Sequence, residues 1–177
     1  GDTLYVGGDF TTISAQGRNR IAAVEVSTGN LFPWHPNANG SVRVLLKSGP
    51  TIFAGGAFTN IGGQSRNRIA ALSVTTGSAS SWNPNANSQI QALALVGDTL
   101  YAGGQFTSIS GVTRNRIAAV STATASAFTW NPNANSQVTA IAFGNGMLYA
   151  GGQFTTIGGQ TRNRLAALDA ASGLASA

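Results

Sequence analysis

The residues best suited to chemistry in this chain are arginines, which come in pairs at a fixed spacing. The triplet Arg-Asn-Arg occurs four times, every 48 residues, and supplies eight of the ten basic side chains. These are Arg18, Arg20, Arg66, Arg68, Arg114, Arg116, Arg162 and Arg164. A guanidinium offers five N–H donors in one plane, which suits oxyanions and backbone carbonyls alike. One hypothesis is therefore a rim of arginines that binds anionic glycans, other polyanions or, least expected, nucleic acid.

Three tryptophans recur with the same period, at Trp34, Trp82 and Trp130. Exposed indoles could stack on sugars, so the candidate ligand-binding set is the eight arginines with these three tryptophans. A residue that every copy needs is more simply one that builds the fold, and the sequence favours this structural interpretation. In it, the arginines lie on one face of a strand, bind tryptophan faces or connector carbonyls, and tie one repeat to its neighbour.

Catalytic and metal-binding chemistry has little support. The chain has no cysteine, five acids and one histidine, His35, which replaces the asparagine of the other connectors. Asp9 has no acidic counterpart in the other copies, so no carboxylate ligand recurs there. The spacing of these residues does not exclude a Ser-His-Asp catalytic triad, but no motif in the sequence indicates one. We expect no enzyme activity, no metal and no cofactor, and a neutral role for His35.

Each copy is predicted to be all strand. Asn145-Gly146, between two short apolar runs, is a strong hairpin signal, and the second strand ends at a Gly-Gly pair. A loop follows, and then a third strand that opens with the arginine triplet. After a turn at Ser27-Thr28-Gly29-Asn30, a short fourth strand ends at the tryptophan. The unit predicted is a four-stranded antiparallel meander.

The link between copies is a fixed connector, Asn83-Pro84-Asn85-Ala86-Asn87 in its clearest form. Proline cannot donate to a sheet, and asparagine suits turns. Five extended residues reach roughly 17 Å, whereas the outer and inner strands of one sheet lie about 14 Å apart. The connector can therefore lead from the outer strand of one sheet to the inner strand of the next, which is the path of a β-propeller.

Composition is consistent with a packed protein whose surface is polar rather than charged. Of 177 residues, 42% are hydrophobic and 8% charged, and the net charge of +5 comes mostly from the triplets. No apolar run approaches the ~20 residues of a membrane-spanning helix, and no signal peptide is recognisable.

The segment Gly55-Gly56-Ala57-Phe58-Thr59-Asn60-Ile61, with Arg66-Asn67-Arg68-Ile69-Ala70 after it, resembles the delta-60-type propeller repeat of bacterial secreted and surface proteins. The resemblance extends over the whole chain. It implies a β-propeller and a secreted or cell-surface location, and it carries over no activity or ligand.

We therefore predict a single repeat domain over 1–177, with repeats 1–48, 49–96, 97–144 and a truncated 145–177, or about 3.7 blades. We expect it to be part of a longer propeller or to close a ring with a second copy, so its partners would be other propeller blades, with an extracellular glycan or protein besides. The predicted function is a non-catalytic scaffold, adhesion or interaction module. The alternative is a lectin-like or polyanion-binding propeller.

Overall fold

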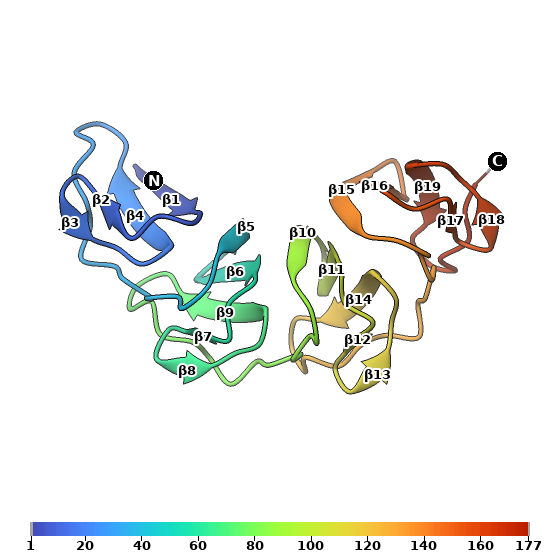
Figure 1. Ribbon diagram of the computed structural model, residues 1–177, viewed down its shortest axis with the longest axis horizontal. Coiled ribbons are helices and arrows are strands. Elements are labelled where there is room, and N and C mark those ends of the chain that lie inside the picture. Colours follow the sequence, from blue (N-terminus) through green and yellow to red (C-terminus); the bar gives the residue numbers. More distant parts are fainter. Residues whose placement is uncertain (1, 177) are drawn as a thin grey trace. The chain divides into compact units, whose positions relative to one another are not determined.

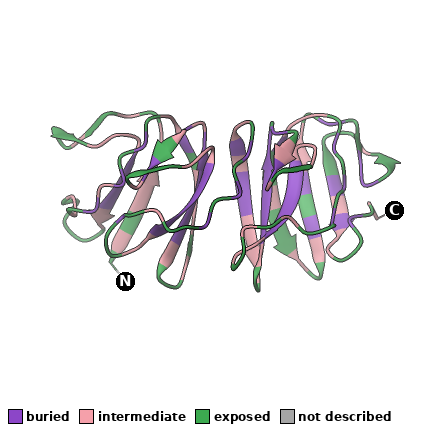
Figure 2. Ribbon diagram, turned by 90° about the horizontal axis from the view of Figure 1, so that it is seen from below, coloured by how far each residue is buried: buried purple, intermediate pink, exposed green. Residues whose placement is uncertain are grey.

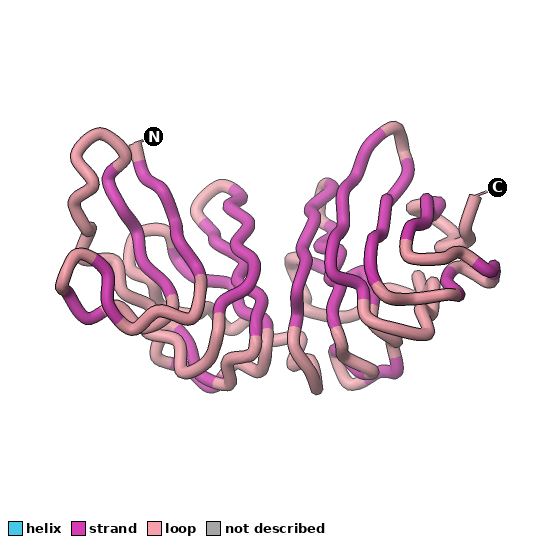
Figure 3. The backbone as a smooth tube through the Cα atoms, turned by 45° about the horizontal axis from the view of Figure 1, so that its top comes forward, coloured by secondary structure: helices cyan, strands magenta, loops and turns pink. Residues whose placement is uncertain are grey.

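The computed structural model describes residues 2–176, and within these residues it consists of strands, turns and loops (Figure 3). No helix in that range is long and apolar enough to cross a membrane. The chain divides into unit 1, Gly1–Asn83, and unit 2, Pro84–Ala177. The all-β fold of antiparallel propeller blades is confirmed. The single domain predicted over 1–177 stays a prediction.

Unit 1 contains a two-stranded and a three-stranded antiparallel sheet (Figure 1). The strands are β1 (Thr3–Gly7) with β4 (Ile21–Glu25), and β5 (Val42–Ser48), β6 (Thr51–Gly56) and β9 (Ile69–Ser73) in the order β5-β6-β9. The predicted loop after each Gly-Gly pair forms a small hairpin, β2 (Thr12–Ile13) with β3 (Gln16–Gly17) and β7 (Asn60–Ile61) with β8 (Gln64–Ser65).

Unit 2 contains two three-stranded sheets, and their inner strands, β10 and β15, are in contact. The sheets are β10 (Ile90–Val96), β11 (Thr99–Gly104) and β14 (Ile117–Ser121), then β15 (Val138–Gly144), β16 (Met147–Gly152) and β19 (Leu165–Asp169). The small hairpins are β12 (Ser108–Ile109) with β13 (Val112–Thr113) and β17 (Thr156–Ile157) with β18 (Gln160–Thr161).

The predicted fourth strand is present as a short segment that pairs with the third strand. In unit 2, Val120 forms an antiparallel bridge with Ala127, and the Phe128 N–H donates to the Ala119 carbonyl at 2.9 Å. The turn before this segment requires a left-handed residue, which is Gly29 (φ 73°) in the first copy. Each blade thus has the predicted path, with a shortened outer strand.

The arginine triplet does not open the third strand, and that prediction is wrong. The third strands begin one residue after the triplet, at Ile21, Ile69, Ile117 and Leu165. The second arginine of each triplet is left-handed, with φ of 63° at Arg20, 68° at Arg68, and 66° at Arg116 and Arg164. Strand alternation therefore does not set the directions of the two arginines.

Close backbone approach explains the Gly-Gly pair. A Cβ on Gly152 would lie 2.1 Å from the Gln137 carbonyl oxygen, next to a bulge in β15 between Val138 and Ala140. A Cβ on Gly103 would lie 2.9 Å from Cγ1 of Val138, which belongs to the next sheet. The second glycine admits the chain at the start of the inner strand of its own sheet, and the first admits the neighbouring blade.

Each unit has its own apolar core between its sheets, visible as buried segments of strand in Figure 2. In unit 2, Tyr101, Ile117 and Trp130 pack with Leu148 and Phe154. Leu148 and Phe154 have no exposed surface. Burying one such side chain contributes about 1.5–3 kcal/mol, so the strands' apolar residues fix the face-to-face packing.

Candidate functional site

The first arginine of each triplet is bound to backbone carbonyls of its own blade. Nη1 of Arg114 donates to the Thr113 carbonyl and Nη2 to the Phe128 carbonyl, each at 2.7 Å. The same pair of bonds recurs at Arg18, Arg66 and Arg162. The expectation that these arginines tie one blade to its neighbour is wrong, because they hold the fourth segment to the end of the small hairpin within one blade.

The second arginine varies more between copies. Nη1 of Arg20 donates to the connector carbonyl of Ala38 at 3.3 Å. Nη1 of Arg116 donates to the carbonyls of Gln105 at 3.0 Å and Phe106 at 3.2 Å, and Arg68 donates to the Ala57 carbonyl. Arg164 is exposed. The second arginines therefore do not share one set of partners, as the first arginines do.

Trp34 and Trp130 each connect neighbouring blades within a unit. Trp130 is 6% exposed, its Nε1 donates to the Asp169 carbonyl of the next blade at 3.1 Å, and its ring meets the Tyr101 ring edge-on at 5.1 Å. Trp34 repeats this arrangement, and Trp82, also buried, packs edge-on against Phe53. A buried ring offers no face to a sugar in solvent.

The connector asparagines have a role that the sequence reasoning missed. Oδ1 of Asn135 accepts the N–H groups of Thr155 at 2.9 Å and Thr156 at 3.1 Å, and its Nδ2 donates to Oγ1 of Thr155 at 2.7 Å. Nδ2 of Asn115, the central residue of a triplet, donates to Oδ1 of Asn133 at 2.7 Å. The Asn-Pro-Asn pattern thus positions the small hairpin of the following blade.

A polar cavity of about 360 Å³ lies in unit 2, and we call it the glutamine pocket. Its lining residues are Ser88, Gln105, Arg116, Ser136, Gln137 and Gln153. Gln105 and Gln153 directly follow β11 and β16. Ser88 lies just before β10, Ser136 and Gln137 lie just before β15, and Arg116 lies just before β14. Nε2 of Gln105 donates to Oε1 of Gln137 at 2.5 Å, and the Gln153 N–H donates to the Gln137 carbonyl at 2.9 Å. The connector therefore brings two blades together around the cavity.

Apart from Arg116, the residues of the glutamine pocket stand at positions that differ between copies. In the first copy, Asp9 stands at the position of Gln105, and Ser41 stands at that of Gln137. The Ser41 hydroxyl donates to Oδ1 of Asp9, so the two positions also meet in unit 1. Of the pocket residues, the sequence had named only Arg116 as a candidate. The difference between Asp9 and Gln105, and between Ser41 and Gln137, at equivalent repeat positions was the sequence feature that could have indicated this site.

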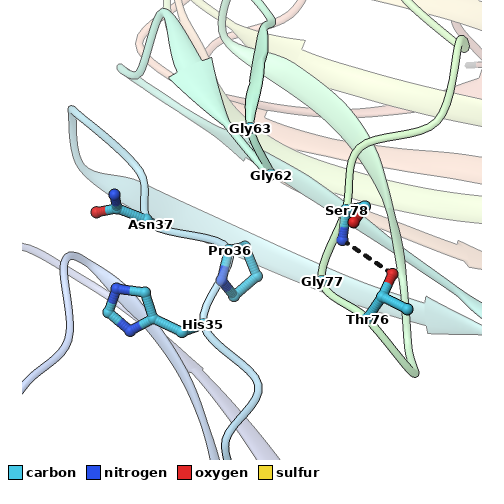
Figure 4. Close-up of a pocket in the computed structure, with 8 residues that line it drawn as sticks. All are labelled: His35, Pro36, Asn37, Gly62, Gly63, Thr76, Gly77 and Ser78. Carbon is cyan, nitrogen blue, oxygen red and sulfur yellow. Dashed lines mark hydrogen bonds between the residues drawn. The ribbon is translucent and has the colours of Figure 1, made fainter.

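A second pocket, of about 300 Å³, lies in unit 1 (Figure 4). His35, Pro36 and Asn37 line one side, and residues 62–63 and 76–78 line the other. Burial, and then the charge of Arg18, lower the pKa of His35. No carboxylate lines this pocket, and the described residues contain no group of three histidines, cysteines or acids able to hold a metal ion.

Comparison with known proteins supports a β-propeller repeat. A family model described as a domain of unknown function (DUF5122) beta-propeller matches residues 51–72 and 144–171. The curated proteins searched include no match.

Solved structures that resemble the chain share its fold at low sequence identity. A chain of the mitotic checkpoint complex has a TM-score of 0.60 at 17% identity, over 88% of this chain and 43% of that one. The computationally designed Ika8 protein has a TM-score of 0.58 at 15% identity, over 99% and 48%. BamB from Moraxella catarrhalis has a TM-score of 0.50 at 20% identity, over 88% and 45%. The chain spans less than half the length of these three proteins. In general the propeller fold suggests an interaction module, and any more specific function must come from the site.

Proposed function

We propose that this chain is a non-catalytic, lectin-like binding module of an exported bacterial protein, with its binding site in the glutamine pocket. The observation that carries the proposal is a division of roles within the repeat. The first arginines, which recur with the repeat, bind carbonyls within one blade, whereas the recurring tryptophans and glycine pairs fit neighbouring segments and blades together. Polar residues at positions that vary between copies, together with the recurring Arg116, instead surround a cavity.

The lining groups of the pocket suit binding rather than catalysis. They are three amides, two hydroxyls and one guanidinium, with no carboxylate or imidazole to act as a general acid or base. Amides and hydroxyls both donate and accept hydrogen bonds, which matches the hydroxyl groups of a sugar. The volume is at the lower end of the roughly 300–1,000 Å³ of small-molecule sites. A terminal sugar of an extracellular glycan is therefore the ligand we propose.

The exported, bacterial setting is supported by the repeat itself. Gly55-Gly56-Ala57-Phe58-Thr59 and the triplet at Arg66 resemble the delta-60-type repeats of secreted and surface proteins. A surface or secreted location would give the pocket access to glycans.

A glycan array with the purified chain tests this function. We expect retention of wild-type protein on a subset of glycans and at least a tenfold loss for Gln153→Ala, whose exposed side chain lines the pocket. The matched control is Gln160→Ala, an exposed glutamine of the same repeat outside the pocket, which should bind as wild type. Absence of retention on every glycan, or equal loss in both variants, would contradict the proposal.

A scaffold role is the second candidate, and the last sheet of unit 2 favours it. Leu165 is 67% exposed and Tyr149 39%, whereas the equivalent residues in the preceding blade, Ile117 and Tyr101, are 0% and 5% exposed because the next sheet covers them. We propose that the face carrying Leu165 and Tyr149 packs against a further propeller blade, in a second copy or a longer chain. Native mass measurement should then give assemblies of the 17.9 kDa chain, with fewer for Leu165→Lys. A stable, isolated monomer would refute packing between copies.

A further inference from the structure

Arg116 brings a fixed positive charge to the glutamine pocket. Its Nη1 is held by the carbonyls of Gln105 and Phe106, which leaves Nη2 and Nε without a hydrogen-bond partner among the described residues. Among the residues that the structure describes, Arg116 forms no ion pair, and no acidic residue lines the glutamine pocket. A guanidinium held in one plane is well suited to binding a planar carboxylate through two N–H groups.

The first copy shows that this place in the repeat accommodates a carboxylate. There Asp9 stands where unit 2 has Gln105, and its Oδ1 accepts a hydrogen bond from the hydroxyl of Ser41. In unit 2 the same two positions hold the neutral amides of Gln105 and Gln137, which bind each other. The first copy thus supplies its own carboxylate, whereas the glutamine pocket has the basic residue and no acid.

The other lining groups would complete the coordination of an acidic sugar. The side chains of Ser88, Ser136 and Gln153 lie around the same cavity and offer hydroxyl and amide hydrogen bonds. A charge-assisted bond is roughly twice as strong as a neutral one, so a carboxylate facing Arg116 would dominate the affinity.

We infer that the glutamine pocket selects sugars that carry a carboxylate, of the uronic acid class, with the carboxylate on Arg116 and the sugar hydroxyls on Ser136 and Gln153. This inference builds on the proposed lectin-like function and specifies its ligand class. Because Asp9 already occupies the corresponding position, unit 1 would not bind such a sugar there.

Titration of the whole chain with glucuronate, glucose and acetate, followed by NMR chemical shifts or calorimetry, tests the inference. We expect glucuronate to bind at least tenfold more tightly than glucose, with an affinity that falls as salt is added. Equal affinities for glucuronate and glucose would overturn the carboxylate selectivity and leave the glycan-binding function standing. Acetate binding as tightly as glucuronate would support the carboxylate site and refute the glycan function. Binding of none of the three would refute both.

The sharpest variant is Gln105→Asp, which gives the pocket the side chain that the first copy uses. Because the repeat already accommodates Asp9 at this position, we expect a folded protein whose glucuronate binding falls at least tenfold and falls more than its glucose binding. Unchanged glucuronate binding by folded Gln105→Asp protein would contradict the inference.

A second variant keeps the test decisive if Gln105→Asp does not fold. Arg116→Gln removes the charge but retains an N–H donor for the Gln105 carbonyl, and it should abolish the preference for glucuronate over glucose. A retained preference would overturn the role assigned to Arg116.

Discussion

Gly152, the second glycine of its pair, offers a stringent test of how closely the start of an inner strand packs on the strand beside it. In Gly152→Ala, the new Cβ would lie 2.1 Å from the Gln137 carbonyl oxygen and 2.9 Å from the Val138 Cα. Unstrained contacts between carbon atoms are about 3.5–4.0 Å. Both obstacles are backbone atoms, which no side-chain rotation can move. The backbone at Gln137 and Val138 must therefore shift, and with it the carbonyl that accepts the Gln153 N–H at 2.9 Å.

The expected cost follows from three terms. Overpacking of a closely packed site costs about 1–3 kcal/mol, and weakening one backbone hydrogen bond adds about 0.5–1.5 kcal/mol. Replacing a strand glycine by alanine returns about 0.5–1 kcal/mol through chain entropy. The net destabilisation of Gly152→Ala is thus about 0.5–4 kcal/mol, which lowers Tm by roughly 2–30 °C in a unit of this size.

Thermal and urea unfolding of the whole chain measure this effect, and Gly144→Ala is the matched control. Gly144 lies in β15 of the same sheet, and its Cβ would meet only Cε2 of Tyr149, at 3.9 Å. The control should be neutral or slightly stabilising, by up to about 1 kcal/mol. If Gly152→Ala melts at the wild-type temperature, or if both variants lose stability equally, the close approach does not constrain the start of β15.

Three further predictions concern single side chains. Trp130→Ala should lower the free energy of unfolding by about 3–5 kcal/mol in urea titrations, because it removes a buried ring and the bond to the Asp169 carbonyl; a loss below about 1 kcal/mol would contradict the tie between blades. Arg114→Ala should cost about 1–3 kcal/mol through its two carbonyl bonds, while Arg164→Ala, at an exposed residue, should stay within about 0.5 kcal/mol; equal effects on Tm would show that the two triplet positions are not distinct. Burial and the Arg18 charge lower the pKa of His35, so its contribution to stability is present above the unfolded pKa of about 6.5 and is lost as pH falls toward the folded pKa. His35→Asn should therefore flatten the fall in Tm between pH 7.5 and 5.5, and a slope identical to wild type would refute the linkage.

The architecture was predictable because its signals are local and repeated. Asn145, in the predicted hairpin turn, has φ of 52°, and Gly29 has φ of 73° in the turn before the fourth segment. Turn chemistry of this kind depends on a few adjacent residues. Because the repeat has a fixed period, a hairpin assigned in one copy also assigns the equivalent strands in the other copies.

The conformation of the triplet was not predictable from local preference. Arginine rarely adopts positive φ, and an Arg-Asn-Arg-Ile run resembles an ordinary strand start. Tertiary contacts decide otherwise, because the Arg116 N–H donates to the Phe106 carbonyl at 2.8 Å and its guanidinium returns to the carbonyls of Gln105 and Phe106. The partners of Arg114 likewise include a carbonyl 14 residues away, which no local pattern indicates.

The glutamine pocket escaped the sequence reasoning for a related reason. Its residues stand at separate points between positions 88 and 153 and form no motif along the chain. Only strand register and the bulge at the start of each inner strand bring Gln105 beside Gln137. Residues that are identical in every copy mostly maintain the fold, so a search limited to them misses most of this pocket.

The position held by Asp9, Ala57, Gln105 and Gln153 shows how this repeat can separate stability from binding. Blades form with an acid, a methyl group or an amide there, so the fold does not depend on a polar side chain at that point. The same position faces the start of the next inner strand, where Asp9 meets Ser41 and Gln105 meets Gln137. Substitutions at this position can therefore change the charge and hydrogen bonding of a pocket without disturbing the carbonyl bonds of the first arginines and the tryptophans. A chain of near-identical blades can in this way present ligand sites of different chemistry.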